Sequence, residues 1–270
     1  TNLPDIYAAG DCAMVHHAIT GKAAWSPMGS TANIAGRLLA QNIMGKELKY
    51  RGVLGTAVCK LPGLNVGRTG LTEAQAKIEG FHPVSVVTVV DDKAHYYAGA
   101  SSFIIKMIAD KESLRLLGVQ VIGAGAVDKV VDIAVTGITM KATLPQLADM
   151  DLAYAPPFST AIHPFTHTLN VLMNKIQGNL ESFTPAEYAA GAAEGYRVVD
   201  GCLVPSIAGA PYVELTDVTG PVDGLDPEEK LLLVCNKGKR AYLLQNRLKS
   251  YGYKNTRVLE AGITFNDVEA

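Results

Sequence analysis

One cysteine of the sequence stands where its thiol could act as a nucleophile. The apolar run of residues 231–234 predicts a buried strand, Cys235 follows it at once, and residues 239–251 predict a helix. Cys235 therefore lies in a tight turn at a helix N-terminus, where amide groups and the helix dipole favour an anion. Three basic side chains add positive charge: Lys237, Lys239 and Arg240. We expect a depressed thiol pKa and a thiolate that can accept a sulfane sulfur as a persulfide; the alternative is a buried structural cysteine.

The same run resembles the active-site loop of rhodanese-like domains. Its Cys-x-x-Gly-x-Arg pattern, from Cys235 to Arg240, precedes a helix, and residues 258–262 resemble the closing strand and turn of that fold. The resemblance implies a small α/β rhodanese-like domain over residues 196–270, with Cys235 and Arg240 as catalytic residues. A full domain of this class has on the order of 100 residues, so this one is shortened, and whether its loop is active or degenerate stays open. Cys202 is a second thiol that could resolve a persulfide on Cys235.

A second group of residues, near the start of the chain, could bind sugar-like hydroxyl groups. Residues 3–9 predict a short buried strand that ends at Gly10 and Asp11. A carboxylate at the carboxyl end of a strand can accept hydrogen bonds from a ligand there, and glycine permits a close approach. A plain Asp-capped turn is the alternative. A helix is expected over residues 31–44, with Thr31 as its N-cap.

The string Ile-Tyr-Ala-Ala-Gly-Asp, residues 6–11, resembles the second flavin motif of the FAD-dependent pyridine nucleotide–disulfide oxidoreductases. Residues 24–37 resemble the helix that opens beside the flavin ring in this family. The resemblance implies that residues 1–51 are the C-terminal tail of an FAD-binding α/β domain. The residues that it places on FAD are Gly10, Asp11 and Ala32.

Residues 52–181 consist of short β-branched runs punctuated by glycine and aspartate, which are typical of an antiparallel sheet. Strands are expected at residues 56–60, 64–69, 84–90, 103–109 and 116–122, and helices at 72–79, 127–140 and 166–177. The pattern predicts an α+β unit with helices flanking the sheet. Small and polar residues then predict a linker at 182–195. After it, strands are expected at residues 197–199, 212–215, 230–234 and 256–259.

The α+β unit resembles the dimerisation domain of the same reductase family. The strings at residues 154–159 and 96–100 place it nearest the coenzyme A-disulfide reductase, NADH oxidase and polysulfide reductase group. The resemblance implies a homodimer in which Tyr97 and Tyr154 reach the partner's reactive cysteine and the substrate disulfide, where a phenol can donate a hydrogen bond. Packed edge tyrosines are the alternative. His163 departs from the group's pattern and is expected to be a surface or interface histidine. The alternative is an acid–base role, which the His of a His-Pro pair has in the glutathione reductase branch.

The bulk composition limits the classes of function. The chain has 270 residues, 48% hydrophobic and 19% charged, enough for two or three globular units. Its net charge of −2 favours neither nucleic acid nor a membrane surface, and no signal peptide is recognisable. The four cysteines are widely spaced, so no metal site is expected. The same spacing favours a reducing, cytoplasmic location. The chain starts without methionine and is expected to be part of a longer protein.

Together these features predict the C-terminal portion of an NAD(P)H- and FAD-dependent reductase of CoA disulfide, CoA persulfide or polysulfide. The sequence holds no N-terminal Gly-x-Gly-x-x-Gly motif and no nicotinamide-binding domain, so weak or no FAD binding is expected of this chain alone. The alternative is a non-catalytic dimerisation and sulfur-carrier module with a degenerate rhodanese loop.

Overall fold

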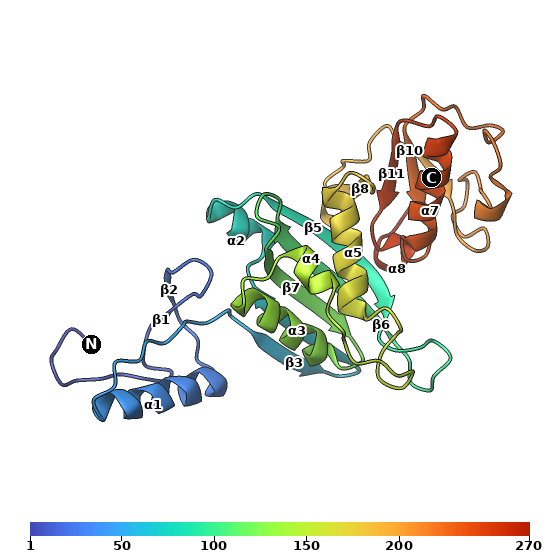
Figure 1. Cartoon of the computed structure of the whole chain (residues 1–270). Helices are drawn as coiled ribbons and strands as arrows, with labels where there is room; N and C mark the ends of the chain where they lie inside the picture. The colour runs from blue at the N-terminus through green and yellow to red at the C-terminus, as the bar shows by residue number, and fades with distance from the viewer.

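The computed structural model describes residues 1–270. Figure 1 shows three parts in chain order: an N-terminal segment, a central unit built on a large sheet, and a C-terminal unit at the far end of the central one. None of the helices is both long and apolar enough to cross a lipid bilayer.

The central unit is an antiparallel sheet with the strand order β3-β4-β7-β6-β5. Its strands are β3 (Ala57–Leu61), β4 (Leu64–Gly70), β5 (Pro83–Asp91), β6 (Ser102–Asp110) and β7 (Leu116–Gly123). All five expected strands are confirmed, because β-branched residues between glycine and aspartate turns mark strand ends clearly.

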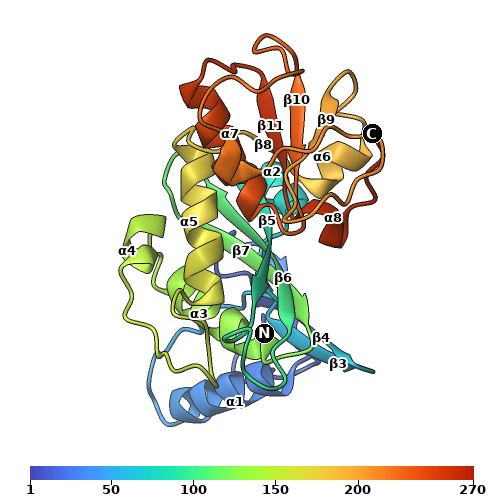
Figure 2. The same cartoon turned by 90° about the vertical axis from the view of Figure 1, so that its right-hand side faces the viewer.

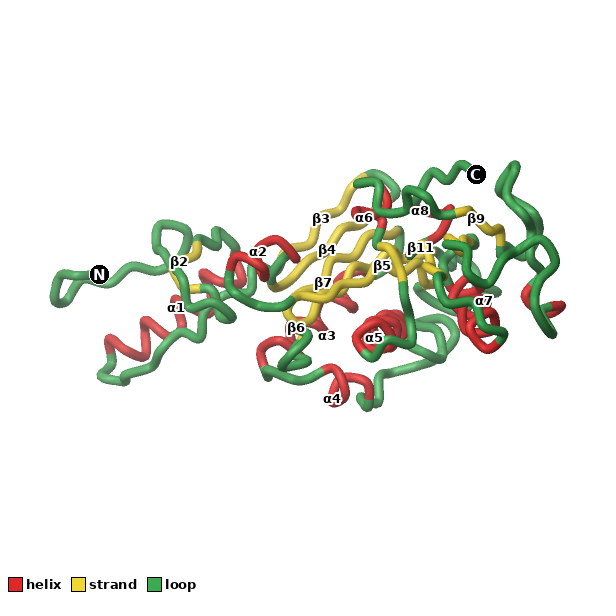
Figure 3. The backbone as a smooth tube through the Cα atoms, turned by 90° about the horizontal axis from the view of Figure 1, so that it is seen from above, coloured by secondary structure: helices red, strands yellow, loops and turns green.

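Three helices cover one face of this sheet (Figure 3): α3 (Val127–Thr139), α4 (Leu144–Ala148) and α5 (Pro164–Ile176). A short helix, α2 (Glu73–Ile78), follows β4 and is capped by Thr72. The main core joins the helices to the sheet through Val130, Val131, Leu169, Leu172, Ile105, Met107, Val119 and Val121. Burial of each such side chain stabilises the fold by roughly 1.5–3 kcal/mol. This core holds the loops at the end of the sheet in place.

The C-terminal unit is a parallel sheet with the order β8-β11-β10-β9. Its strands are β8 (Ser182–Phe183), β9 (Arg197–Asp200), β10 (Leu231–Val234) and β11 (Thr256–Leu259). Helix α7 (Lys239–Ser250) covers one face and α6 (Pro185–Ala189) the other (Figure 2), and α8 (Gly262–Phe265) follows β11. The apolar run of β10 is explained by this arrangement, because Leu231 and Leu233 face one core cluster while Leu232 and Val234 face the other.

The structure corrects two expectations for the C-terminal unit. The expected linker at residues 182–195 contains β8 and α6, and β8 pairs with β11, so the parallel sheet begins before residue 196. A two-residue strand has no periodicity that a sequence could reveal. The expected strand at residues 212–215 is wrong: Tyr212 makes a single bridge to Asp200, and a 3-10 turn, η1 (Leu215–Asp217), follows.

The N-terminal segment contains a two-stranded hairpin and one long helix: β1 (Val15–His16), β2 (Ala23–Ala24) and α1 (Gly29–Ile43). The expected buried strand at residues 3–9 is wrong. These residues are irregular and mostly exposed, because no strand lies beside them to pair their N–H and C=O groups. Thr31 is not the N-cap either. It lies in the first turn of α1, and its hydroxyl oxygen is 2.9 Å from that of Ser26.

Candidate functional site

The Cys235 loop joins β10 to α7. Gly238 precedes the helix with φ +89°, a left-handed conformation that glycine adopts readily, and turns the chain into α7. Cys235 is only 2% exposed, and its Sγ accepts a hydrogen bond from the amide of Ala241 at 3.3 Å. The thiol therefore lies between a strand end and a helix N-terminus, as the sequence predicts.

The backbone of this loop offers a set of free donors. The amide groups of residues 236–240 have no hydrogen-bond acceptor within the chain, and the next amide, of Ala241, donates to the Cys235 sulfur. Free N–H groups in a turn at a helix N-terminus attract anions. The loop can thus stabilise negative charge on Cys235 or on a sulfur bound to it.

Arg240 does not add an unpaired charge to the loop, contrary to the prediction. Its guanidinium donates to the carbonyl oxygen of Gly201 at 3.1 Å and to Glu214 Oε1 at 2.9 Å. The hydrogen bonds from Arg240 and Tyr212 hold the pKa of Glu214 at about 2. Arg240 therefore ties α7 to the segments that surround the loop.

Cys202 lies in the same core cluster as Cys235. Burial and the neighbouring carboxylate of Asp200 raise the pKa of its thiol to about 12. A thiol with such a pKa stays protonated near neutral pH and is a poor nucleophile. The structure therefore gives Cys202 a packing role and no feature of a resolving thiol.

The turn after β11 braces the Cys235 loop. The amides of Ile263 and Thr264 donate to the carbonyl oxygens of Cys235 and Asn236 at 3.1 and 3.0 Å. A Cβ atom on Gly262 would lie 1.8 Å from the Cys235 carbonyl oxygen. Only glycine fits against the loop at this position.

A buried carboxylate docks the C-terminal unit on the central sheet, and sequence reasoning missed it. Glu260 is 3% exposed, and its two oxygens accept from three donors: the amide of Val87 at 2.7 Å, Lys175 Nζ at 2.7 Å and Ser182 Oγ at 2.6 Å. Val87 belongs to edge strand β5, so Glu260 satisfies a free N–H of the sheet edge. Its place directly after an apolar strand is the one local signal that could have marked it.

Lys237 makes a second contact between the two units. Its Nζ lies 2.7 Å from Asp91 Oδ1 and 3.2 Å from Ser102 Oγ, at the facing ends of β5 and β6. The prediction that Lys237 adds free positive charge to the thiol is therefore wrong, because a carboxylate compensates it. The two contacts hold the Cys235 loop against the end of the central sheet.

The two tyrosines of interest lie on loops that meet. Tyr97 is 43% exposed and Tyr154 is 52% exposed, and neither hydroxyl group has a hydrogen-bond partner within the chain. Their loops come together: Lys93, which precedes Tyr97, and Phe158, which follows Tyr154, line the same cavity. Both side chains are therefore available to a neighbouring molecule. Tyr96, the neighbour of Tyr97, packs its ring edge-on against His95.

His163 is buried within the single chain, so of the two expected positions, surface or interface, the surface one is wrong. It is 6% exposed, and its Nδ1 accepts a hydrogen bond from the amide of Phe165 at 3.1 Å, which makes it the N-cap of α5. Burial, together with the nearby charge of Lys129, lowers its pKa to about 4. His163 is therefore neutral near pH 7.

Stability is expected to fall as the pH drops from 6.5 towards 4, because folded His163 resists protonation. Its pKa is about 4 in the folded chain, against an ordinary 6.5. The folded state then binds fewer protons than the unfolded state, so this contribution is complete above pH 6.5 and is lost on the way to pH 4. A shift of this size corresponds to about 3 kcal/mol.

Urea unfolding between pH 7 and pH 4 checks this prediction. His163→Asn keeps an acceptor at the N-cap and removes the titrating ring, so its stability should change less with pH than that of the wild type. His95→Asn, at an exposed position, is the matched control and should retain the wild-type slope. Equal slopes for all three proteins would contradict the prediction.

The proposed flavin residues lie together only in part. Gly10 has φ +81°, and a Cβ there would touch the Ala32 side chain at 3.8 Å. A groove of about 520 Å³ begins here, lined by Gly10, Thr31 and Leu38 among others. Asp11 is exposed, and its backbone carbonyl accepts from Trp25 Nε1 at 2.9 Å, while its carboxylate has no partner within the chain.

The profile of the pyridine nucleotide-disulphide oxidoreductase dimerisation domain matches residues 56–165. The central unit is a dimerisation domain of this family. The antiparallel sheet with flanking helices is thereby confirmed as the predicted α+β unit.

Two curated relatives from archaea match 64% of the chain. The NAD(P)H sulfur oxidoreductase (CoA-dependent) of Pyrococcus furiosus is 40% identical over 172 residues, which are 39% of its length. The NAD(P)H coenzyme A polysulfide/persulfide reductase of Pyrococcus horikoshii is 39% identical over 172 residues, which are 38% of its length. The match thus spans about two fifths of each relative.

Two solved structures match nearly the whole chain. The NAD-dependent persulfide reductase from A. fulgidus has 32% identity and a TM-score of 0.89, over 97% of this chain and 48% of that one. Bacillus anthracis CoADR-RHD has 29% identity and a TM-score of 0.86, over 96% of this chain and 48% of that one. These matches include the C-terminal unit, whose parallel sheet and helices form the predicted rhodanese-like α/β fold.

Proposed function

We propose that the chain is the C-terminal portion of an NAD(P)H- and FAD-dependent pyridine nucleotide–disulfide oxidoreductase that reduces CoA disulfide, CoA persulfide or polysulfide. In this proposal Cys235 carries sulfur for the enzyme. The observation that supports it is the Cys235 loop, which combines one buried thiol with amide groups that have no acceptor. The names of the relatives support the substrate class.

The sulfur-carrying step balances with thiosulfate as donor. The Cys235 thiolate attacks the sulfane sulfur, a new S–S bond forms on Sγ, the donor S–S bond breaks, and sulfite leaves with the electron pair. The free amides of residues 236–240 stabilise the negative terminal sulfur of the persulfide. A thiolate acceptor such as coenzyme A then attacks the terminal sulfur of the persulfide. A new S–S bond forms on the acceptor, the S–S bond to Sγ breaks, and Cys235 leaves as the thiolate.

The other parts of the chain have supporting roles in this proposal. The central unit forms a homodimer, and exposed Tyr97 and Tyr154 reach the partner subunit's active site, where their hydroxyls donate to a thiolate or disulfide. We assign Gly10, Asp11 and Ala32 to one end of an FAD molecule, because Gly10 lines a groove and the carboxylate of the exposed Asp11 next to it has no partner within the chain. FAD would supply the two-electron transfer from NAD(P)H.

The alternative is a non-catalytic dimerisation module whose rhodanese loop is degenerate and no longer carries sulfur. Two observations favour it: Cys235 is only 2% exposed, and Arg240 is held by Glu214. In that case the tight packing around the thiol prevents a donor from reaching it, and the loop serves to dock the unit.

Mass spectrometry of the intact chain separates the two functions. After exposure to thiosulfate or CoA persulfide, the wild type is expected to gain one sulfur, about 32 Da, on a single cysteine. Cys235→Ser should gain nothing, and Cys202→Ser, the control at the second buried thiol, should be loaded like the wild type. A native spectrum of the same sample should show a dimer. No adduct on the wild type would exclude the carrier role, and a monomer would exclude the homodimer.

A further inference from the structure

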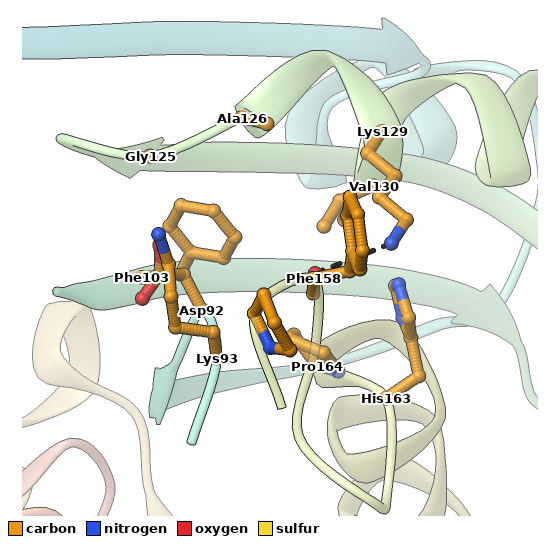
Figure 4. A pocket seen from close by; sticks show the side chains of 11 residues that line it. Asp92, Lys93, Phe103, Gly125, Ala126, Lys129, Val130, Phe158, His163 and Pro164 are labelled. Carbon is orange, nitrogen blue, oxygen red and sulfur yellow. Dashed lines mark hydrogen bonds and ion pairs between the residues drawn. The ribbon is translucent and has the colours of Figure 1, made fainter. Parts of the chain in front are cut away.

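A small cavity of about 190 Å³ lies in the central unit, apart from the Cys235 loop. The N-terminal turn of α3, the residues just after β5 and the segment that leads into α5 surround it (Figure 4). Its polar lining consists of the side chains of Asp92, Lys93, Lys129 and His163 and of the backbone around Phe158. Nothing in the proposed reaction uses this cavity.

His163 presents an unused donor to the cavity. Because its Nδ1 accepts the Phe165 amide, the neutral ring carries its hydrogen on Nε2. No group of the chain accepts from Nε2, although the residue is only 6% exposed. Figure 4 shows the ring pointing towards the ammonium group of Lys129. His163 lines the cavity, so this N–H is open to a ligand that enters it.

Lys129 reaches the same space from α3. Its Nζ donates to the carbonyl oxygen of Phe158 at 3.3 Å, and no carboxylate lies within 4.0 Å of it. Two donors, the ammonium of Lys129 and the Nε2–H of His163, therefore converge without an acceptor between them. Each could donate a charge-assisted hydrogen bond to a negatively charged oxygen placed there.

The cavity carries one positive charge that no carboxylate compensates. Lys93 is compensated by Asp92, whose Oδ2 is 3.8 Å away and whose Oδ1 accepts from the Ser101 amide at 2.7 Å. Lys129 has no such partner. A bound anion would neutralise the charge of Lys129, whereas a cation would be repelled by the ammonium groups of Lys93 and Lys129.

We propose that this cavity binds a small tetrahedral oxyanion of the phosphate or thiosulfate class, held by Lys129 Nζ and His163 Nε2. The volume of about 190 Å³ admits such an anion with a few waters. The anion is either free or a phosphoryl group of a larger molecule such as a coenzyme, because both offer the same oxygens. The site is independent of the sulfur-carrying role of Cys235.

Calorimetric titration with inorganic phosphate, thiosulfate and coenzyme A, at constant ionic strength set by sodium chloride, tests the proposal. Saturable binding at one site per chain is expected for at least one probe, and it should persist in Cys235→Ser, which cannot accept sulfur. Lys129→Gln and His163→Asn should each weaken it by about tenfold or more, as expected for the loss of one charged hydrogen bond. Lys60→Gln, which removes an exposed and unpaired charge from β3, is the matched control and should bind like the wild type.

Each outcome decides the question. Binding of phosphate or thiosulfate identifies a free anion, and binding of coenzyme A alone identifies a phosphoryl group of a larger ligand. The nitrogen chemical shift of His163 Nε2 should move with the bound probe, which separates direct contact from a general charge effect. Saturable binding of none of the probes, or equal weakening in Lys60→Gln, would overturn the proposal.

Discussion

Replacing Gly262 with alanine is expected to displace the Cys235 loop and to lower the unfolding free energy of the C-terminal unit by more than about 3 kcal/mol. The new Cβ would lie 1.8 Å from the carbonyl oxygen of Cys235 and 2.7 Å from that of Asn236. Both are backbone atoms, so no side-chain rotation relieves the overlap. The end of β10 or the start of α7 must shift, and either shift moves the thiol. Sulfur loading of Cys235 should be lost as well.

Gly252→Ala is the matched control for this change. Gly252 also has a positive φ, +92°, but no atom lies within 4 Å of its added Cβ. It should therefore show only the backbone strain of a left-handed alanine, about 1–2 kcal/mol. Hydrogen exchange of residues 231–259, read by mass spectrometry, compares the two variants. Equal loss of protection in both would show that the overlap with Cys235 is not decisive.

The position of Cys235 was predictable because every feature that places it is local. An apolar run, a glycine turn and a helical pattern follow one another within 21 residues, 231–251. The strands of the central sheet were predictable for the same reason. Residues 3–9 were mispredicted because an apolar run forms a strand only beside another strand. No strand of this chain pairs with these residues.

The electrostatics of the loop were not predictable, because the partners are distant in sequence. Lys237 was assigned to the thiol, yet it pairs with Asp91, 146 residues away. Glu260 contacts Val87 across 173 residues and Lys175 across 85. Sequence spacing carries no information on such contacts, which appear only once two separate units are docked.

Replacing Glu260 with alanine is expected to lower the unfolding free energy by about 3–5 kcal/mol, the usual effect of breaking a buried ion pair. The variant leaves the amide of Val87 without its acceptor and the ammonium of Lys175 without its carboxylate partner, with only the carbonyl oxygen of Ser85 left to it at 3.1 Å. Glu260 itself is 3% exposed. The C-terminal unit should then separate from β5. Faster hydrogen exchange at the Val87 amide would report that separation directly.

Two further variants make this prediction specific. Glu228→Ala breaks an ion pair with Lys254 whose side chains are 66% and 70% exposed, so it should change the free energy by no more than about 1 kcal/mol. Adding Lys175→Met to Glu260→Ala removes the unpaired charge and should recover part of the loss, while exchange at Val87 stays fast. Were Glu260→Ala to resemble Glu228→Ala, the carboxylate would not dock the two units. The Cys235 loop would then depend on Lys237 and Asp91 alone for its place beside the central sheet.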